Sequence, residues 1–65
     1  MNNDNLNDIV AVITKNENKD KVGGGAPIFI VNDDPELEEM SMLLSRITLG
    51  MVHDIGQGIK IIIRH

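Results

Sequence analysis

Runs of apolar residues separated by polar segments predict three strands and one helix. Three short β-branched runs, typical of β-strands, occupy residues 8–14, 27–31 and 59–64. Between the last two, apolar residues recur at helical spacing from Pro35 to Asp54 or Ile55. The order β-β-α-β predicts a small α+β domain, with a three-stranded sheet and one helix packed on one face.

Polar residues and glycines mark the ends of these elements. Asp34 is expected as the helix N-cap, with Pro35 at the first helical position. Gly56 stands where a left-handed C-cap belongs. Residues 15–26 form a polar connection that ends in three glycines and is long for a hairpin. Either this connection is mobile, or the strands extend into it.

The chain of 65 residues is predicted to hold one domain, residues 8–65, after a disordered Asn-rich tail, residues 1–7. It has no cysteine, which excludes a disulfide framework. No apolar run approaches the ~18–20 residues needed to span a bilayer, and the first residues lack the positive charge of a signal peptide. A cytoplasmic location is the expectation.

Apolar positions on the predicted helix exceed what one face needs. A broad arc, expected to pack on the sheet, contains Leu37, Met40, Leu43, Leu44, Ile47, Met51 and Ile55. Met42 and Leu49 lie outside this arc and Val52 lies at its edge, which makes a second apolar strip. The strands are also apolar on both faces, and one helix covers only one of them. We therefore predict a homodimer with Met42, Leu49 and Val52 in its interface.

Charge is concentrated at the start of the predicted helix. Five carboxylates fall within seven residues: Asp33, Asp34, Glu36, Glu38 and Glu39. Acids at a helix start are favoured by the macrodipole, which accounts for Asp34 and Glu36. Asp33, Glu38 and Glu39 exceed what helix capping requires. Two interpretations stay open: helix capping and solubility alone, or a partner-binding surface that a dimer presents twice. A net charge of -4 argues against direct nucleic-acid binding.

No motif for catalysis, metal binding or cofactor binding is found. The Asn32–Pro35 segment lacks the ligand spacing of a calcium loop, and no Lys-Ser or Lys-Thr follows the triple glycine as in a phosphate loop. Besides carboxylates, only His53 and His65 are candidate metal ligands. We therefore expect no enzyme activity, no metal and no cofactor, and a function in binding.

The segment 32–39, taken with the small size, the acidity and the abundance of Asn, Ile and Lys, resembles the host-takeover proteins of phages that infect low-GC bacteria. Some proteins of that class are DNA mimics. The resemblance implies inhibition of a basic DNA-binding host protein, such as nucleoid-associated HU or RNA polymerase, in the bacterial cytoplasm. The alternative is a structural or regulatory dimerisation or adaptor module that binds its partner through an apolar surface.

Overall fold

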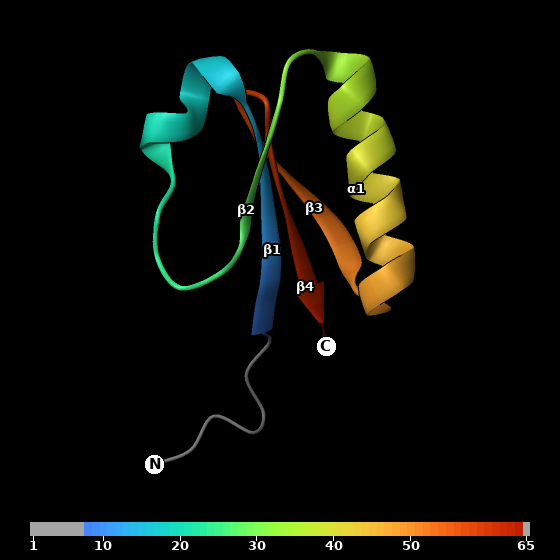
Figure 1. The fold of residues 1–65 in the computed structure, drawn as a ribbon. Helices are drawn as coiled ribbons and strands as arrows, with labels where there is room; N and C mark the ends of the chain where they lie inside the picture. The colour runs from blue at the N-terminus through green and yellow to red at the C-terminus, as the bar shows by residue number, and fades with distance from the viewer. Residues whose placement is uncertain (1–7, 65) are drawn as a thin grey trace.

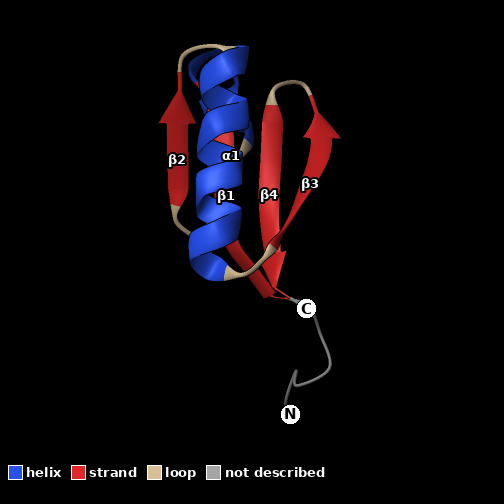
Figure 2. Cartoon of the chain, turned by 90° about the vertical axis from the view of Figure 1, so that its right-hand side faces the viewer, coloured by secondary structure: helices blue, strands red, loops and turns tan. Residues whose placement is uncertain are grey.

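The structure, a computed structural model, describes residues 8–64 (Figure 1). In order, this range forms β1 (Asp8–Lys15), the 3-10 helix η1 (Asn16–Lys21), β2 (Ile28–Val31), α1 (Asp34–Thr48), β3 (Met51–Gly56) and β4 (Ile59–Arg64). The strands described make one mixed sheet in the order β2-β1-β4-β3. Helix α1 packs on one face of this sheet (Figure 2). The α+β class is confirmed, whereas the predicted tail, residues 1–7, lies outside the described residues.

The connection between β1 and β2 is a crossover, because the two strands run parallel. Parallel neighbours need a crossover of about a dozen residues, which explains why residues 16–27 are too long for a hairpin. Part of this connection is ordered as η1, which lies on the face of the sheet opposite α1 (Figure 1). On that side Val12 and Thr14 of β1 are buried although no α-helix covers them.

The predicted three-stranded sheet is wrong for the described residues, which form four strands. The predicted helix was too long, because α1 ends at Thr48 and the next residues form β3. Gly50 explains the stop. A Cβ built there lies 2.6 Å from Cγ2 of Ile62, so this position accepts only glycine against the core. Glycine inside a helix costs about 1 kcal/mol relative to alanine. Gly50 accordingly lies outside the helix, in the short connection between α1 and β3.

A tight hairpin joins β3 to β4 where the sequence predicted a helix C-cap. Gln57 and Gly58 have φ angles of 58° and 73°, which is the backbone of a two-residue type I′ turn. Gly56 also has a positive φ, but it ends a strand rather than a helix. The left-handed C-cap of α1 is instead Leu49, whose N–H donates to the Ser45 carbonyl.

The core lies between α1 and the two central strands. Its buried members are Ala11, Ile13, Val31, Leu37 and Ile62, with Val10, Phe29, Met40 and Leu44 packed against them. Ser41 is also buried, and its hydroxyl donates to the Leu37 carbonyl at 2.6 Å. This back-bond satisfies the hydroxyl inside the core. The buried face of α1 therefore includes Ser41 as well as Leu37, Met40 and Leu44 of the predicted apolar arc, whereas Leu43 and Ile47 of that arc are exposed.

Leu49 is strained in its cap position. It is an L-residue with φ 59° and its side chain is 85% exposed. The left-handed conformation costs roughly 1–2 kcal/mol for residues other than glycine. We therefore expect Leu49→Gly to stabilise the fold by about 1 kcal/mol, which corresponds to a rise of about 4–8 °C in Tm for a domain of this size. Leu49→Ala removes the same side-chain contacts but keeps the strain, so its Tm is expected to be about 4–8 °C lower than that of Leu49→Gly. Equal Tm shifts in the two variants, read by circular dichroism, would contradict this.

Candidate partner-binding surface

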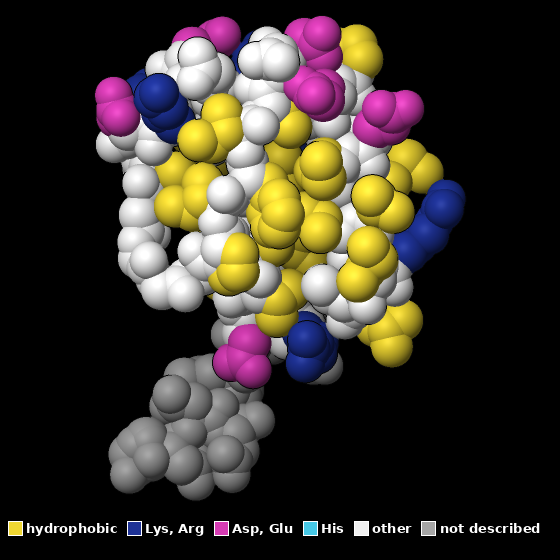
Figure 3. Space-filling model, in the orientation of Figure 1, with side chains coloured by type: hydrophobic (Ala, Val, Ile, Leu, Met, Phe, Trp, Pro, Cys, Tyr) yellow, Lys and Arg dark blue, Asp and Glu magenta, His cyan; other side chains and the backbone are white. Residues whose placement is uncertain are grey.

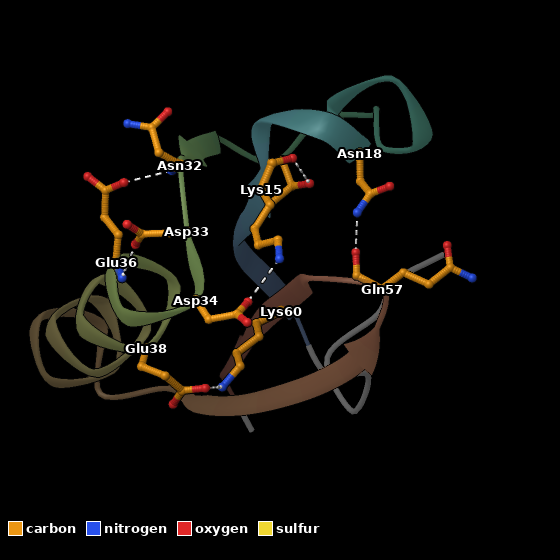
Figure 4. A network of polar contacts seen from close by, with 10 residues as sticks. Lys15, Asn18, Asn32, Asp33, Asp34, Glu36, Glu38, Gln57 and Lys60 are labelled. Carbon is orange, nitrogen blue, oxygen red and sulfur yellow. Dashed lines mark hydrogen bonds and ion pairs between the residues drawn. The ribbon is translucent and has the colours of Figure 1, made fainter.

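The start of α1 is capped by Asp33 and not by Asp34. Oδ1 of Asp33 accepts from the Glu36 N–H at 2.9 Å, and the first turn of α1 then holds Asp34 and Pro35. Oε1 of Glu36 accepts in turn from the Asn32 N–H at 2.6 Å. This is close to a capping box, in which two backbone donors are satisfied reciprocally. Two of the predicted binding carboxylates therefore hold the helix terminus (Figure 4).

Two further carboxylates of the acidic cluster are paired with lysines from the sheet. Nζ of Lys15 on β1 donates to Oδ1 of Asp34 at 3.0 Å. Nζ of Lys60 on β4 donates to Oε2 of Glu38 (Figure 4). The hydrogen bond and the attraction to Asp34 raise the pKa of Lys15 above its ordinary value, so the Lys15 ammonium group stays charged at neutral pH. The lysines tie the helix to the sheet and neutralise much of the predicted anionic patch.

The outward flank of α1 on the β2 side is apolar. Viewed down the helix at 100° per residue, Ile47 and Leu43 lie roughly 80° and 120° from Leu37 in one sense of rotation. Glu38 lies about 100° away in the other sense, where it reaches β4. The Leu43 and Ile47 side chains are 50% and 67% exposed. Both were predicted to be core residues, and the structure places them at the surface.

A shallow pocket opens on this flank. It has a volume of about 370 Å³ and is lined by Glu36, Glu39, Met40 and Leu43. Met40 and Leu43 supply an apolar floor, and the two glutamates place carboxylates at the same site. Pockets of this chemistry suit an apolar side chain that is accompanied by a cation.

Strand β2 forms one edge of the sheet beside this flank. The Val12 N–H donates to the Pro27 carbonyl at 2.9 Å, so the backbone of Pro27 faces β1. Backbone groups alternate along a strand. Phe29 and Val31 therefore also face β1, whereas the N–H and C=O groups of Ile28 and Ile30 point outward from the sheet. The side chains of Ile28 and Ile30 are exposed, and they project from the face of the sheet opposite α1, because Phe29 and Val31 pack in the core under the helix.

Apolar side chains gather around this edge. Figure 3 shows them between the β1–β2 crossover and α1, with carboxylates above them. We call this region the β2 edge surface, and define it by Ile28, Ile30, Met40, Leu43 and Ile47, with Glu36 and Glu39 at its margin. It joins a strand edge, an apolar helix flank and two acids from segments that are separate in the sequence.

The predicted dimer strip lies on the other flank of α1. Met42, Leu49 and Val52 are all exposed, as the prediction required. They do not share a helix, because Leu49 caps α1 and Val52 belongs to β3. Val52 pairs with Ile62 and so faces the helix side of the sheet. The role of these three residues in a dimer interface stays a prediction.

Within residues 8–64, no group of three or more His, Cys, Asp or Glu side chains is placed to hold a metal ion. In the same range, α1 is too short and too polar to cross a membrane.

Sequence comparison identifies the family. Residues 7–65 match the family described as "Capping complex subunit for YIEGIA". The chain belongs to this family. It is also 42% identical over 57 residues to the Bacillus subtilis (strain 168) protein YpzH, across 88% of this chain and 86% of YpzH. No solved structure matches.

Membership of the capping family corrects three predictions. The resemblance to phage host-takeover proteins is wrong, because the chain matches a bacterial capping-subunit family and a protein of Bacillus subtilis. The predicted function as a DNA mimic, and the predicted partner, a basic DNA-binding protein, are wrong for the same reason. The physical reason is visible at Asp34 and Glu38, whose charges are paired with lysines of the same chain.

The sequence interpretation missed the β2 edge surface. Leu43 and Ile47 were assigned to the core because polar Ser41 was not considered as a core residue. The edge position of β2 depends on strand order, which the sequence does not reveal. One signal was present, since Pro27 precedes the strand and proline is typical of sheet edges.

Proposed function

We propose that this chain is a non-catalytic subunit that caps YIEGIA by binding it through an apolar surface. The family description supports the partner. The observation that carries the proposal is the β2 edge surface, where four isoleucine and leucine side chains are each at least 37% exposed on the two sides of one sheet edge: Leu43 and Ile47 on α1, and Ile28 and Ile30 on the face opposite α1. Exposed apolar side chains that gather in one place mark interaction sites in soluble proteins.

Apolar contact also accords with the modest charge of the surface. Among the described residues, the ion pairs involve Asp34 and Glu38, which leaves a limited negative field. A binding mode based on apolar burial depends little on salt, whereas a charge-driven mode weakens steeply as salt is raised. The salt dependence of binding therefore separates the two modes.

The test is co-expression of the full chain with the YIEGIA protein of the same organism, followed by affinity purification in 0.1 M and 0.5 M NaCl. A stoichiometric complex that survives the higher salt is expected. If the two proteins elute separately under both conditions, the proposed function is wrong. If the complex forms only at low salt, the binding is electrostatic and the apolar mode is wrong.

Self-association remains a proposal of its own. We propose a homodimer through the strip of Met42, Leu49 and Val52, which lies on the flank of α1 away from the β2 edge surface. Support comes from their exposure of 55%, 85% and 36%. Light scattering on the purified chain is expected to give twice the mass of one chain. A single-chain mass at concentrations above about 100 μM, where even weak dimers associate, would contradict it.

A further inference from the structure

We propose that the outer edge of β2 accepts an extended segment of the YIEGIA partner as an added strand. The segment carries apolar side chains at alternate positions and a lysine or arginine that reaches Glu36 and Glu39. This inference rests on the proposed function and specifies its binding mode. Strand addition is a common route to peptide recognition, with backbone hydrogen bonds for affinity and side-chain pockets for specificity.

The backbone of β2 is arranged for such an addition. The N–H and C=O groups of Ile28 and Ile30 point away from β1, as the Val12–Pro27 hydrogen bond requires. An extended segment placed alongside can bond to both residues. Unpaired edges are normally guarded by charges, bulges or prolines, or by making the strand very short. Strand β2, Ile-Phe-Ile-Val, is short, but it contains no charged residue, bulge or proline.

The opposite edge of the sheet, strand β3, is protected by a charged residue and a bulge. Strand β3 carries Asp54, and its pairing with β4 shifts register between Asp54 and Gly56. Oδ1 of Asp54 accepts from the Gly56 N–H at 2.8 Å, which fixes the irregularity. The two edges of this small sheet therefore differ: β3 carries a charge and a bulge, whereas β2 carries neither.

Charge indicates the chemistry of the added segment. The ion pairs between described side chains use Asp34 and Glu38, so Glu36 and Glu39 keep their negative charge for a partner, with Oε2 of Glu36 remaining outside its bond to the Asn32 N–H. Both line the pocket beside Met40 and Leu43. A guanidinium or ammonium group there would form charge-assisted hydrogen bonds.

A second copy of this chain fits the edge less well. If β2 of another copy were the added strand, the residues around it would have to supply the cation. Residues 23–34 contain no lysine or arginine, and they contain Asp33 and Asp34. A self-paired edge would leave the two pocket glutamates without a cation from the added segment. The observations therefore favour a segment of a different protein.

The backbone contribution is tested by two substitutions at one position. Ile30→Pro removes the outward N–H as well as the side chain, and Ile30→Ala removes only the side chain. Because this N–H points away from β1, proline leaves the β1–β2 bonds in place. With the YIEGIA protein as the immobilised probe, Ile30→Pro is expected to bind about tenfold more weakly than Ile30→Ala. Equal affinities of the two folded variants would overturn the added strand.

The charge contribution is tested without altering β2. Glu39→Lys is expected to weaken YIEGIA binding at least about tenfold. Asp20→Lys makes the same charge change on exposed η1, and is expected to bind like the wild type. This pair keeps the inference testable if the proline variant does not fold. Similar affinities of the two lysine variants would overturn the predicted cation contact.

The remaining outcomes distinguish a failure of the proposed function from a failure of the added strand. A wild-type chain that does not bind the YIEGIA protein overturns the proposed function and the added strand together. A wild-type chain that binds, with Ile30→Pro and Glu39→Lys binding equally well, overturns the added strand alone. A wild-type dimer that Ile30→Pro converts to single chains in light scattering would show that a second copy occupies the edge, and would also overturn the inference.

Discussion

Replacing Ile62 by alanine is expected to unfold most of the protein at 37 °C. The Ile62 side chain has 0% exposure and packs in the core beside Ala11 and Leu37. Truncating a buried isoleucine to alanine costs about 2–5 kcal/mol, because transfer energy is lost and a cavity remains. A domain of this size rarely has more than about 3–5 kcal/mol of stability from its core. Urea denaturation followed by circular dichroism measures the loss.

Ile47→Ala is the matched control for this core substitution. It removes the same atoms from a side chain that is 67% exposed, and a surface change of this kind is expected to alter stability by less than about 0.5 kcal/mol. If the two alanine variants unfold at the same urea concentration, the assignment of Ile62 to the core and of Ile47 to the surface is wrong.

Leu43→Asp is expected to reduce binding to the YIEGIA protein about 100-fold while leaving the fold intact. Leu43 belongs to the β2 edge surface, lines its pocket and is 50% exposed. A buried carboxylate beside Glu36 and Glu39 would face like charge and lose its hydration when the partner docks. Residues at the centre of an interface typically cost 2 kcal/mol or more when they are lost, which is about 30-fold, and the introduced charge adds to this.

Met42→Asp provides the control on the same helix. Met42 is adjacent in sequence and 55% exposed, against 50% for Leu43, but it lies on the flank towards β4 and β3. It is expected to bind YIEGIA as the wild type does, and to reduce self-association if the dimer strip is used. Equal loss of YIEGIA binding in the two variants would place the partner elsewhere on α1.

Local patterns predicted much of the fold. The β-branched runs located β1, β2 and β4 to within one residue at their ends, because strand propensity and bounding polar residues act locally. The stop of α1 at Leu49–Gly50 was missed, since the apolar spacing continues through Met51 and Ile55. The decisive contact is the approach of Gly50 to Ile62, which is distant in the sequence.

The candidate site was less predictable than the fold, because it depends on long-range contacts. Acids at the start of α1 were visible in the sequence, but their pairing with Lys15 and Lys60 joins residues 19 and 22 positions apart. The parallel pairing of β1 with β2 also determines which backbone groups face outward. Neither feature follows from periodicity alone.

Amide hydrogen exchange of the isotopically labelled chain, free and in complex with the YIEGIA protein, tests the central claim most directly. The internal controls are Phe29 and Val31, whose backbone faces β1, whereas Ile28 and Ile30 face outward. In the free chain, Ile28 and Ile30 are expected to exchange faster than their neighbours. On binding, exchange at Ile28 and Ile30 is expected to slow at least about tenfold, because an added strand bonds to them. A YIEGIA complex in which these two amides exchange as they do in the free chain would contradict the account.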